Sequence, residues 1–120
     1  TESEFHESVT KYDIVTDIKE YLQKNDYLDV LIVMNDTVAF AAYKAASELR
    51  KDIPDDLKLI SYGNYNWSSF PTIGLTTFEQ HFFKYGKEAV KLLLKRMSGT
   101  SSMIQQRRII KYDLQRRKSF

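Results

Sequence analysis

The chain has 120 residues, of which 42% are hydrophobic and 28% charged, a composition typical of a globular protein with room for one domain. Its 18 basic and 16 acidic residues give a net charge of +2, too balanced for a dedicated nucleic-acid-binding protein, and its apolar runs are too short for a transmembrane helix. Cysteine is absent, which excludes disulfides, thiol catalysis and zinc-finger clusters, and the first residues lack the pattern of a secretory signal.

The chain opens with a predicted helix, a strand and a second helix. Residues 12–23 show helical periodicity, because apolar side chains recur every three or four positions between charged ones. The apolar, β-branched run at 29–34 predicts a strand buried on both faces, as in a parallel sheet. That run ends at Asn35-Asp36, and either side chain can cap the alanine-rich helix expected over residues 37–50.

A second strand is expected over residues 57–62, after a proline turn that ends the helix. The order strand, helix, strand over residues 29–62 predicts a parallel pair joined by a right-handed crossover. Residues 63–72 have the Gly, Asn, Ser and Pro content of a loop, and a short β-prone segment follows at 73–77.

The last part of the chain predicts a long helix over residues 79–97 with a wide apolar arc. The arc consists of one stripe and a flanking row, namely Phe82, Gly86, Ala89, Leu93 and Met97, with Phe83, Val90 and Leu94 beside them. Residues 103–117 read as one or two β segments broken near Tyr112-Asp113. Basic residues crowd this end of the chain: Arg107, Arg108, Lys111, Arg116, Arg117 and Lys118. They indicate either a phosphate-binding strip or the charged edge of a strand, which discourages aggregation.

Catalytic patterns are weak in this sequence. The two histidines, His6 and His81, are far apart, and the sequence has no Gly-rich phosphate loop, metal-ligand motif or nucleophile elbow. Asp55-Asp56 is a carboxylate pair, but it lies in a proline turn where Asp is expected anyway. We therefore expect neither enzymatic activity nor a cofactor nor a metal site.

A binding site is better supported, because ligands of open α/β sheets lie beyond the carboxyl ends of parallel strands. Two such ends carry hydrogen-bonding side chains, at Asn35-Asp36 and at Gly63-Asn64. Asp36 could equally be a plain helix cap, and Asn64 a plain turn residue. The loop that follows also carries three aromatic residues, Tyr65, Trp67 and Phe70. Their rings could stack on a sugar, cover an edge of the core or form a subunit contact.

Taken in order, several motifs resemble the lactose/galactose repressor (LacI/GalR) family of bacterial transcription regulators. In the first half they are Asn35-Asp36 between an apolar strand and an Ala-rich helix, and Ile53-Pro54-Asp55-Asp56-Leu57 leading into Leu59-Ile60-Ser61-Tyr62. In the second half they are Leu75-Thr76-Thr77 with Gln80 three residues on, a helix with Gly86-x-x-Ala89, and the closing Leu114-Gln115-Arg116-Arg117-Lys118-Ser119. Their order and spacing carry the resemblance, which covers about residues 12–120.

The resemblance implies an α/β fold, a parallel-sheet lobe like that of periplasmic binding proteins with helices packed on the sheet. An effector would bind in the cleft between two such lobes. Residues 1–120 would be part of the effector-binding and dimerisation domain, with residues 1–77 and 103–120 in the second lobe and the helix 78–98 in the first. The family also implies a cytoplasmic homodimer that senses a small carbohydrate or related metabolite and contacts DNA only through a separate N-terminal head.

The strand ends and the resemblance together give a set of candidate effector-binding residues: Asn35, Asp36, Gly63, Asn64 and Gln80. Asn35 and Gln80 match effector contacts of the family. Gly63 stands where many sugar-binding members have an Asp that holds ligand hydroxyls, and Ser61 replaces a usual Gly. These two departures argue against a standard hexose mode, although Asn64 could partly compensate.

The helix 37–50 matches one that meets its twin in family dimers, with Phe40, Ala41 and Lys44 on the contact side. Two alternatives share the same module. One is a solute-binding protein of a sugar uptake system, and the other is a regulator of the arabinose type with a winged-helix head. In either case, the wide apolar face of the helix 79–97 predicts self-association or domain exchange of this 120-residue chain.

Overall fold

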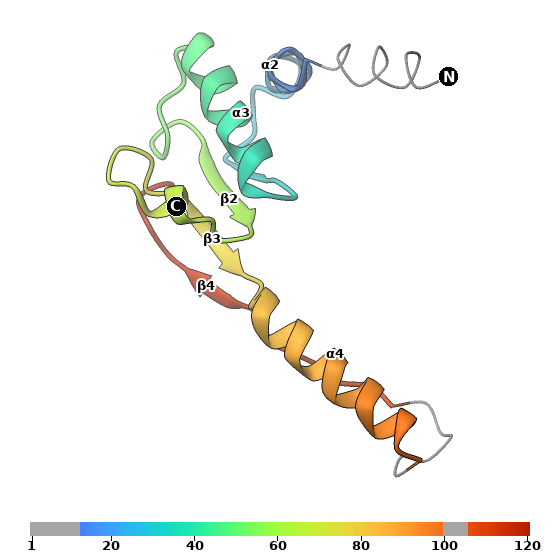
Figure 1. The fold of residues 1–120 in the computed structure, drawn as a ribbon. Coiled ribbons are helices and arrows are strands. Elements are labelled where there is room, and N and C mark those ends of the chain that lie inside the picture. Colours follow the sequence, from blue (N-terminus) through green and yellow to red (C-terminus); the bar gives the residue numbers. More distant parts are fainter. Residues whose placement is uncertain (1–12, 100–105) are drawn as a thin grey trace, which may run out of the picture.

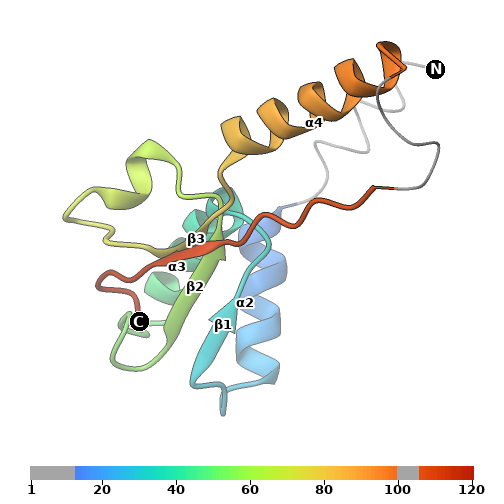
Figure 2. The same cartoon turned by 90° about the horizontal axis from the view of Figure 1, so that it is seen from below.

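The computed structural model describes residues 13–99 and 106–120, which form a four-stranded sheet, two helices packed on it and a third helix that projects from it (Figures 1 and 2). In chain order the elements are α2 (Ile14–Lys24), β1 (Val30–Ile32), α3 (Asp36–Glu48), β2 (Lys58–Tyr62), the 3-10 helix η1 (Asn66–Ser69), β3 (Thr76–Glu79), α4 (Phe82–Met97) and β4 (Asp113–Gln115). No helix of the described ranges is long and apolar enough to cross a membrane.

The strands lie in the order β1-β2-β3-β4, with three parallel strands and β4 antiparallel at the edge. The pairing of Leu31 with Leu59 confirms the parallel pair predicted for the first β–α–β unit. β3 begins later than expected and runs to Glu79. β4 begins at Asp113, so the predicted break near this position is the start of a strand. Of the β segment predicted before it, residues 103–105 lie outside the described residues, and residues 106–112 form no strand.

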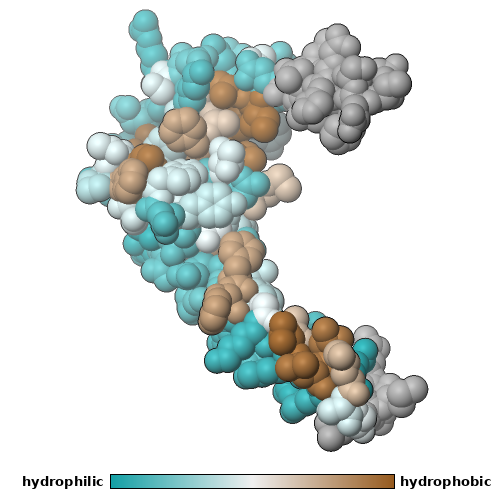
Figure 3. All heavy atoms as spheres, in the orientation of Figure 1, coloured by the Kyte–Doolittle hydropathy of each residue, from teal (hydrophilic) through white to brown (hydrophobic). Residues whose placement is uncertain are grey.

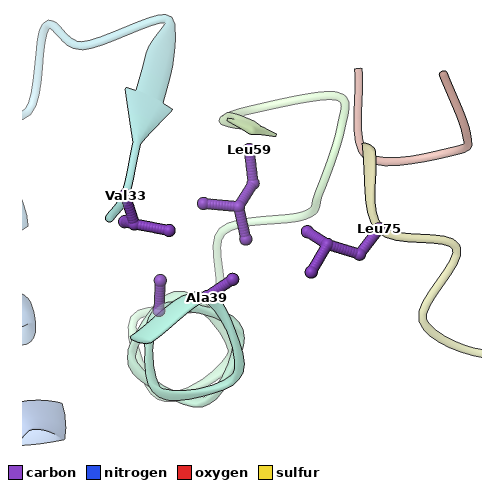
Figure 4. Packing of buried hydrophobic residues seen from close by; sticks show 5 residues of the cluster. Val33, Ala39, Leu59 and Leu75 are labelled. Carbon is purple, nitrogen blue, oxygen red and sulfur yellow. The ribbon is translucent and has the colours of Figure 1, made fainter. Parts of the chain in front are cut away.

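The hydrophobic core lies between the sheet and α3 (Figure 4). Its buried members come from three strand segments and one helix: Val33, Ala39, Ala42, Leu59 and Leu75. The alanines of α3 have no bulky side chain, so the helix lies close against the leucines of the sheet. α2 packs beside α3, where Leu22 is buried and Ile18 contacts the edge of the core.

The prediction that the strand 29–34 is buried on both faces is wrong, because the described helices cover only one face of β1. Leu31 and Val33 contact the core, whereas Ile32 between them is 60% exposed and Met34 is 76% exposed. Side chains alternate between the two faces of a strand, and α2 and α3 both pack on the face of Leu31. The apolar residues of β1 that point the other way therefore remain exposed.

α4 projects beyond the sheet, and none of its residues is buried (Figure 1). His81 adopts a left-handed conformation with φ 51°, so the helix begins at Phe82, three residues later than predicted. The predicted apolar arc is exposed, with Phe83 at 87% and Met97 at 74%, and Figure 3 shows it as a hydrophobic patch on the projecting helix. The radius of gyration is 19.4 Å, against about 14 Å for a compact chain of this length.

Candidate functional site

A hollow of about 500 Å³ lies at the carboxyl ends of β2 and β3. Its lining comes from the loop after β2 and from the crossover between β3 and α4: Gly63, Asn64, Tyr65, Asn66, Trp67, Glu79, His81 and Phe82. Gly63 and Asn64 are thus the two predicted site residues that line the hollow. Ligands of open α/β sheets bind at this edge, which makes the hollow the candidate site.

Gly63 contributes only backbone to the hollow. Its φ of 142° is a backbone conformation that residues other than glycine rarely adopt, and a Cβ at this position would lie 3.2 Å from the ring of Tyr65. Its N–H donates to the carbonyl oxygen of Phe78 at 2.8 Å, which fixes it beside β3. An Asp at position 63 would therefore be strained on this backbone.

The amide of Asn64 is bound on both sides by protein groups. Its Nδ2 donates to Glu79 Oε2 at 2.9 Å, and its Oδ1 accepts from Arg117 Nη2 at 2.7 Å. Arg117 also donates through Nη1 to the carbonyl oxygen of Leu75 at 2.7 Å. Asn64 is consequently held in one orientation at the rim of the hollow, and the guanidinium of Arg117 is bonded to groups of the protein itself.

Two other basic residues near the C-terminus also have contacts within the fold. Lys118 Nζ donates to the carbonyl oxygen of Pro71 at 3.0 Å, and the guanidinium of Arg116 lies 5.6 Å from the centre of the Phe120 ring. Together with Arg117, these contacts favour a structural interpretation of the C-terminal half of the basic cluster over a phosphate-binding strip.

Asp36 is fully buried behind the hollow, where its carboxylate accepts four hydrogen bonds. The donors are the hydroxyls of Ser61, Ser68 and Thr77 and the backbone N–H of Tyr65. Burial raises the pKa of the Asp36 carboxyl, but the four hydrogen bonds stabilise the charged form and together hold its pKa below the ordinary value. In this arrangement the Asp36 carboxylate is enclosed by protein donors and positions the loop that lines the hollow.

Ser61, which stands where the resemblance leads one to expect Gly, is buried and is one of the donors to Asp36. Asn35 is the N-cap of α3, because its Oδ1 accepts from the N–H of Val38 at 2.9 Å. Asn35 does not line the hollow, and neither does Gln80, although both neighbours of Gln80 in the chain do. Effector contacts by Asn35, Asp36 and Gln80 stay predictions.

Glu79 and His81 belong to the site, although the sequence did not single them out for it. His81 Nε2 lies 2.7 Å from Asp113 Oδ2, and His81 Nδ1 lies 3.7 Å from Glu79 Oε1. Glu79 and Asp113 are cross-strand partners in the β3–β4 ladder. The long-range pairing of β3 with β4 brings Asp113 to Glu79 and His81, which local patterns could not reveal. Within residues 13–99 and 106–120, no group of His, Cys, Asp and Glu side chains is arranged to hold a metal ion.

A second, more apolar hollow of about 350 Å³ lies between α3 and the same loop, lined by Thr37, Phe40, Trp67, Phe70 and Ile73. Trp67 lines both hollows, and its ring centre lies 6.0 Å from that of Tyr65 and 6.2 Å from that of Phe40. Phe40, a predicted dimer contact, is 57% exposed here. Of the other two predicted contacts, Ala41 is half-buried and Lys44 is exposed.

The family of periplasmic binding protein-like domains matches residues 8–120. The chain belongs to this family. It is 32% identical, over 80 residues and 67% of its length, to the HTH-type transcriptional repressor PurR of Aliivibrio salmonicida, of which it covers 24%. The predicted resemblance to LacI-type regulators is thereby confirmed, and the chain spans about a quarter of the length of such a repressor.

Solved structures agree with the sequence comparison. A LacI-family transcriptional regulatory protein from Corynebacterium glutamicum is 25% identical with a TM-score of 0.74, over 88% of this chain and 41% of the other. A LacI family transcriptional regulator from Enterococcus faecium, with bound ribose, is 28% identical with a TM-score of 0.73, over 88% of this chain and 38% of the other. These likenesses confirm the predicted α/β fold with a mostly parallel sheet.

Proposed function

We propose that this chain is part of the effector-binding and dimerisation domain of a cytoplasmic transcription regulator, which is not an enzyme. The effector is a small carbohydrate or related metabolite, and DNA is contacted through a separate head domain. The observation that carries the proposal is the hollow at the carboxyl ends of β2 and β3, where Gly63 and Asn64 follow a parallel strand. Its support comes from the repressor relatives and from the ribose bound in the Enterococcus faecium regulator.

In this proposal residues 1–77 and 103–120 belong to one lobe, and residues 78–98 belong to the other. Phe78 and Glu79 still pair in the sheet, so the crossing between lobes follows Glu79. Two features support this division. α4 leaves the sheet after the left-handed turn at His81 and has no buried residue, as expected of a helix that packs in a different lobe. The chain then returns through Asp113 into the antiparallel strand β4. The effector hollow lies beside this crossing point.

Effector binding would act on the dimer through the loop that borders both hollows. Tyr65 and Trp67 line the effector hollow, and Trp67 also contacts Phe40 on the face of α3 that we assign to the homodimer. A ligand that prefers the closed arrangement of the lobes shifts the population toward it. The change in lobe arrangement then alters the spacing of the two heads on DNA.

The experiment that tests the proposal measures metabolite-dependent operator release by the intact wild-type regulator in fluorescence anisotropy, and a regulator that no small carbohydrate or related metabolite releases would contradict it. The same assay on Asn35→Ser tests the predicted effector contact of Asn35, which does not line the hollow. Ser preserves the N-cap of α3 but removes the amide, so folding and DNA binding should persist. We expect the effector concentration for half-release to rise about tenfold, the effect of one lost hydrogen bond to a ligand. Gln23→Ala, which removes an exposed amide from α2, should leave release unchanged. An unchanged response in Asn35→Ser would remove Asn35 from the site.

A further inference from the structure

We infer that Glu79 supplies the ligand-binding carboxylate of the effector hollow, in place of the side chain that Gly63 lacks. The hollow accordingly accepts an uncharged polyhydroxy ligand, such as an unphosphorylated sugar, and rejects its phosphorylated forms. This inference rests on the proposed function, and it adds a specificity-determining residue and a ligand class to it.

The register of the sheet places Glu79 beside Gly63. Tyr62 pairs with Phe78 in the parallel ladder, and the N–H of Gly63 donates to the carbonyl oxygen of Phe78. Glu79 follows Phe78 as the last residue of β3, just as Gly63 follows Tyr62 at the end of β2. Both Gly63 and Glu79 line the hollow. A carboxylate at Glu79 therefore lies at the same edge of the sheet as a side chain at position 63 would, displaced by one strand.

One oxygen of the Glu79 carboxylate accepts a hydrogen bond from the protein, whereas the other has only a longer ion-pair contact with His81 among the described residues. Oε2 accepts from Asn64 Nδ2, and Arg117 fixes Asn64 in the orientation that makes this donation. Oε1 lies 3.7 Å from His81 Nδ1, beyond hydrogen-bond distance. The side chain of Glu79 is 36% exposed. The hydrogen bond to Oε2 fixes the position of Oε1, which can accept a hydrogen bond from a sugar hydroxyl.

The charges around the hollow set the ligand class. Neither Lys nor Arg is among the described residues that line it, and Glu79 is its one carboxylate. Arg117 does not line the hollow, because its guanidinium is bound to Leu75 and Asn64. On this side of the cleft a phosphate group would meet the like charge of Glu79. His81, the one lining side chain that can be cationic, already lies 2.7 Å from Asp113 Oδ2, so burying a phosphate against these residues is unfavourable. The rings of Tyr65, Trp67 and Phe82 suit the apolar face of a sugar ring.

The test is calorimetric titration of the intact regulator with D-ribose, D-galactose, lactose and cellobiose, and with ribose 5-phosphate and galactose 6-phosphate. We expect at least one unphosphorylated sugar to bind, and the sugar phosphates to bind at least about tenfold more weakly or not at all. Glu79→Gln keeps an acceptor for Asn64 but lacks the charge, so it should weaken sugar binding about tenfold and reduce the discrimination against phosphates. Glu20→Gln, an exposed glutamate on α2, is the matched control and should bind as the wild type does.

The outcomes separate the inference from the proposed function. Sugar binding by Glu79→Gln as tight as that of the wild type would overturn the role of Glu79 and leave the effector site standing. Tighter binding of a sugar phosphate than of its parent sugar would overturn the ligand class. If none of these sugars binds, the inference as a whole is overturned. If a different metabolite then releases operator DNA, the proposed function still stands.

Discussion

Asp36 illustrates how one buried charge arranges the candidate site. Its carboxylate joins three segments that are distant in sequence, because it accepts from Ser61 in β2, Ser68 in η1 and Thr77 in β3. Asp36→Ala would leave these hydroxyls without their acceptor, and we expect it to lower the free energy of unfolding by about 3 kcal/mol. Asp55→Ala, in an exposed turn, should change it by less than about 0.5 kcal/mol. Equal losses in urea denaturation would contradict this role of Asp36.

The lowered pKa of Asp36 also predicts how stability depends on pH. The folded state favours the charged carboxylate more than the unfolded state does, so this contribution is fully present above the unfolded pKa of about 4. It is lost as the pH falls through the lower, folded pKa. We expect the wild type to lose more unfolding free energy than Asp36→Asn between about pH 5 and pH 2. Parallel curves for the two proteins in urea denaturation would refute the expectation.

The sequence predicted some residues of the hollow and missed others for a physical reason. Gly63 and Asn64 could be predicted, because the local sequence pattern shows where an apolar strand ends. Glu79 and His81 flank the predicted Gln80, but local patterns do not show which side chains of this crossover face the hollow, because that depends on the register of β3 against β2. The hydrogen bond from Arg117 to the side-chain oxygen of Asn64 also joins residues that are distant in sequence. Local patterns therefore locate the edge of the sheet but not the partners that meet there.

At the scale of elements, the predicted order of helices and strands is present, and the boundaries near the crossover differ. The 3-10 helix η1 was not predicted, since the turn-forming residues of the 63–72 segment predict only a loop. β3 extends to Glu79, because its last residues gain hydrogen-bond partners in β4. His81 is non-helical, which delays α4 to Phe82. Propensity alone assigns these positions to the helix, and tertiary pairing overrides it.

The exposed face of α4 predicts the behaviour of the isolated 120-residue chain. Large apolar side chains without a packing partner associate to remove surface from water, so we expect oligomers in light scattering at high concentration. Leu93 and Leu94 are each 57% exposed, and replacing both by Glu should shift the chain toward monomer. Lys84→Glu also adds negative charge to the helix but removes no apolar surface, and it should have no such effect. A clean wild-type monomer would contradict the prediction.

At the scale of the whole molecule, the face of α3 around the apolar hollow predicts how two copies of the intact protein meet. Phe40 is the exposed aromatic at its centre and packs edge-on against Trp67. Burying a Glu there would be costly, so we expect Phe40→Glu to raise the dimer dissociation constant at least about tenfold in analytical ultracentrifugation. Tyr27→Glu changes an aromatic that is 79% exposed in the α2–β1 turn, and it should leave the constant unchanged. Equal dissociation of both variants would exclude this face.

We propose that the intact protein binds a small carbohydrate or related metabolite between its lobes. A thermal-shift measurement of the intact regulator with a panel of sugars and sugar phosphates tests this proposal, because a ligand that binds only the folded state raises the melting temperature by mass action. At a ligand concentration of about 100 times Kd, the stabilisation is about 2.7 kcal/mol, enough for a shift of a few degrees. We predict such a shift with at least one unphosphorylated sugar. An unchanged melting temperature across the whole panel would contradict the assignment of a carbohydrate effector to this hollow.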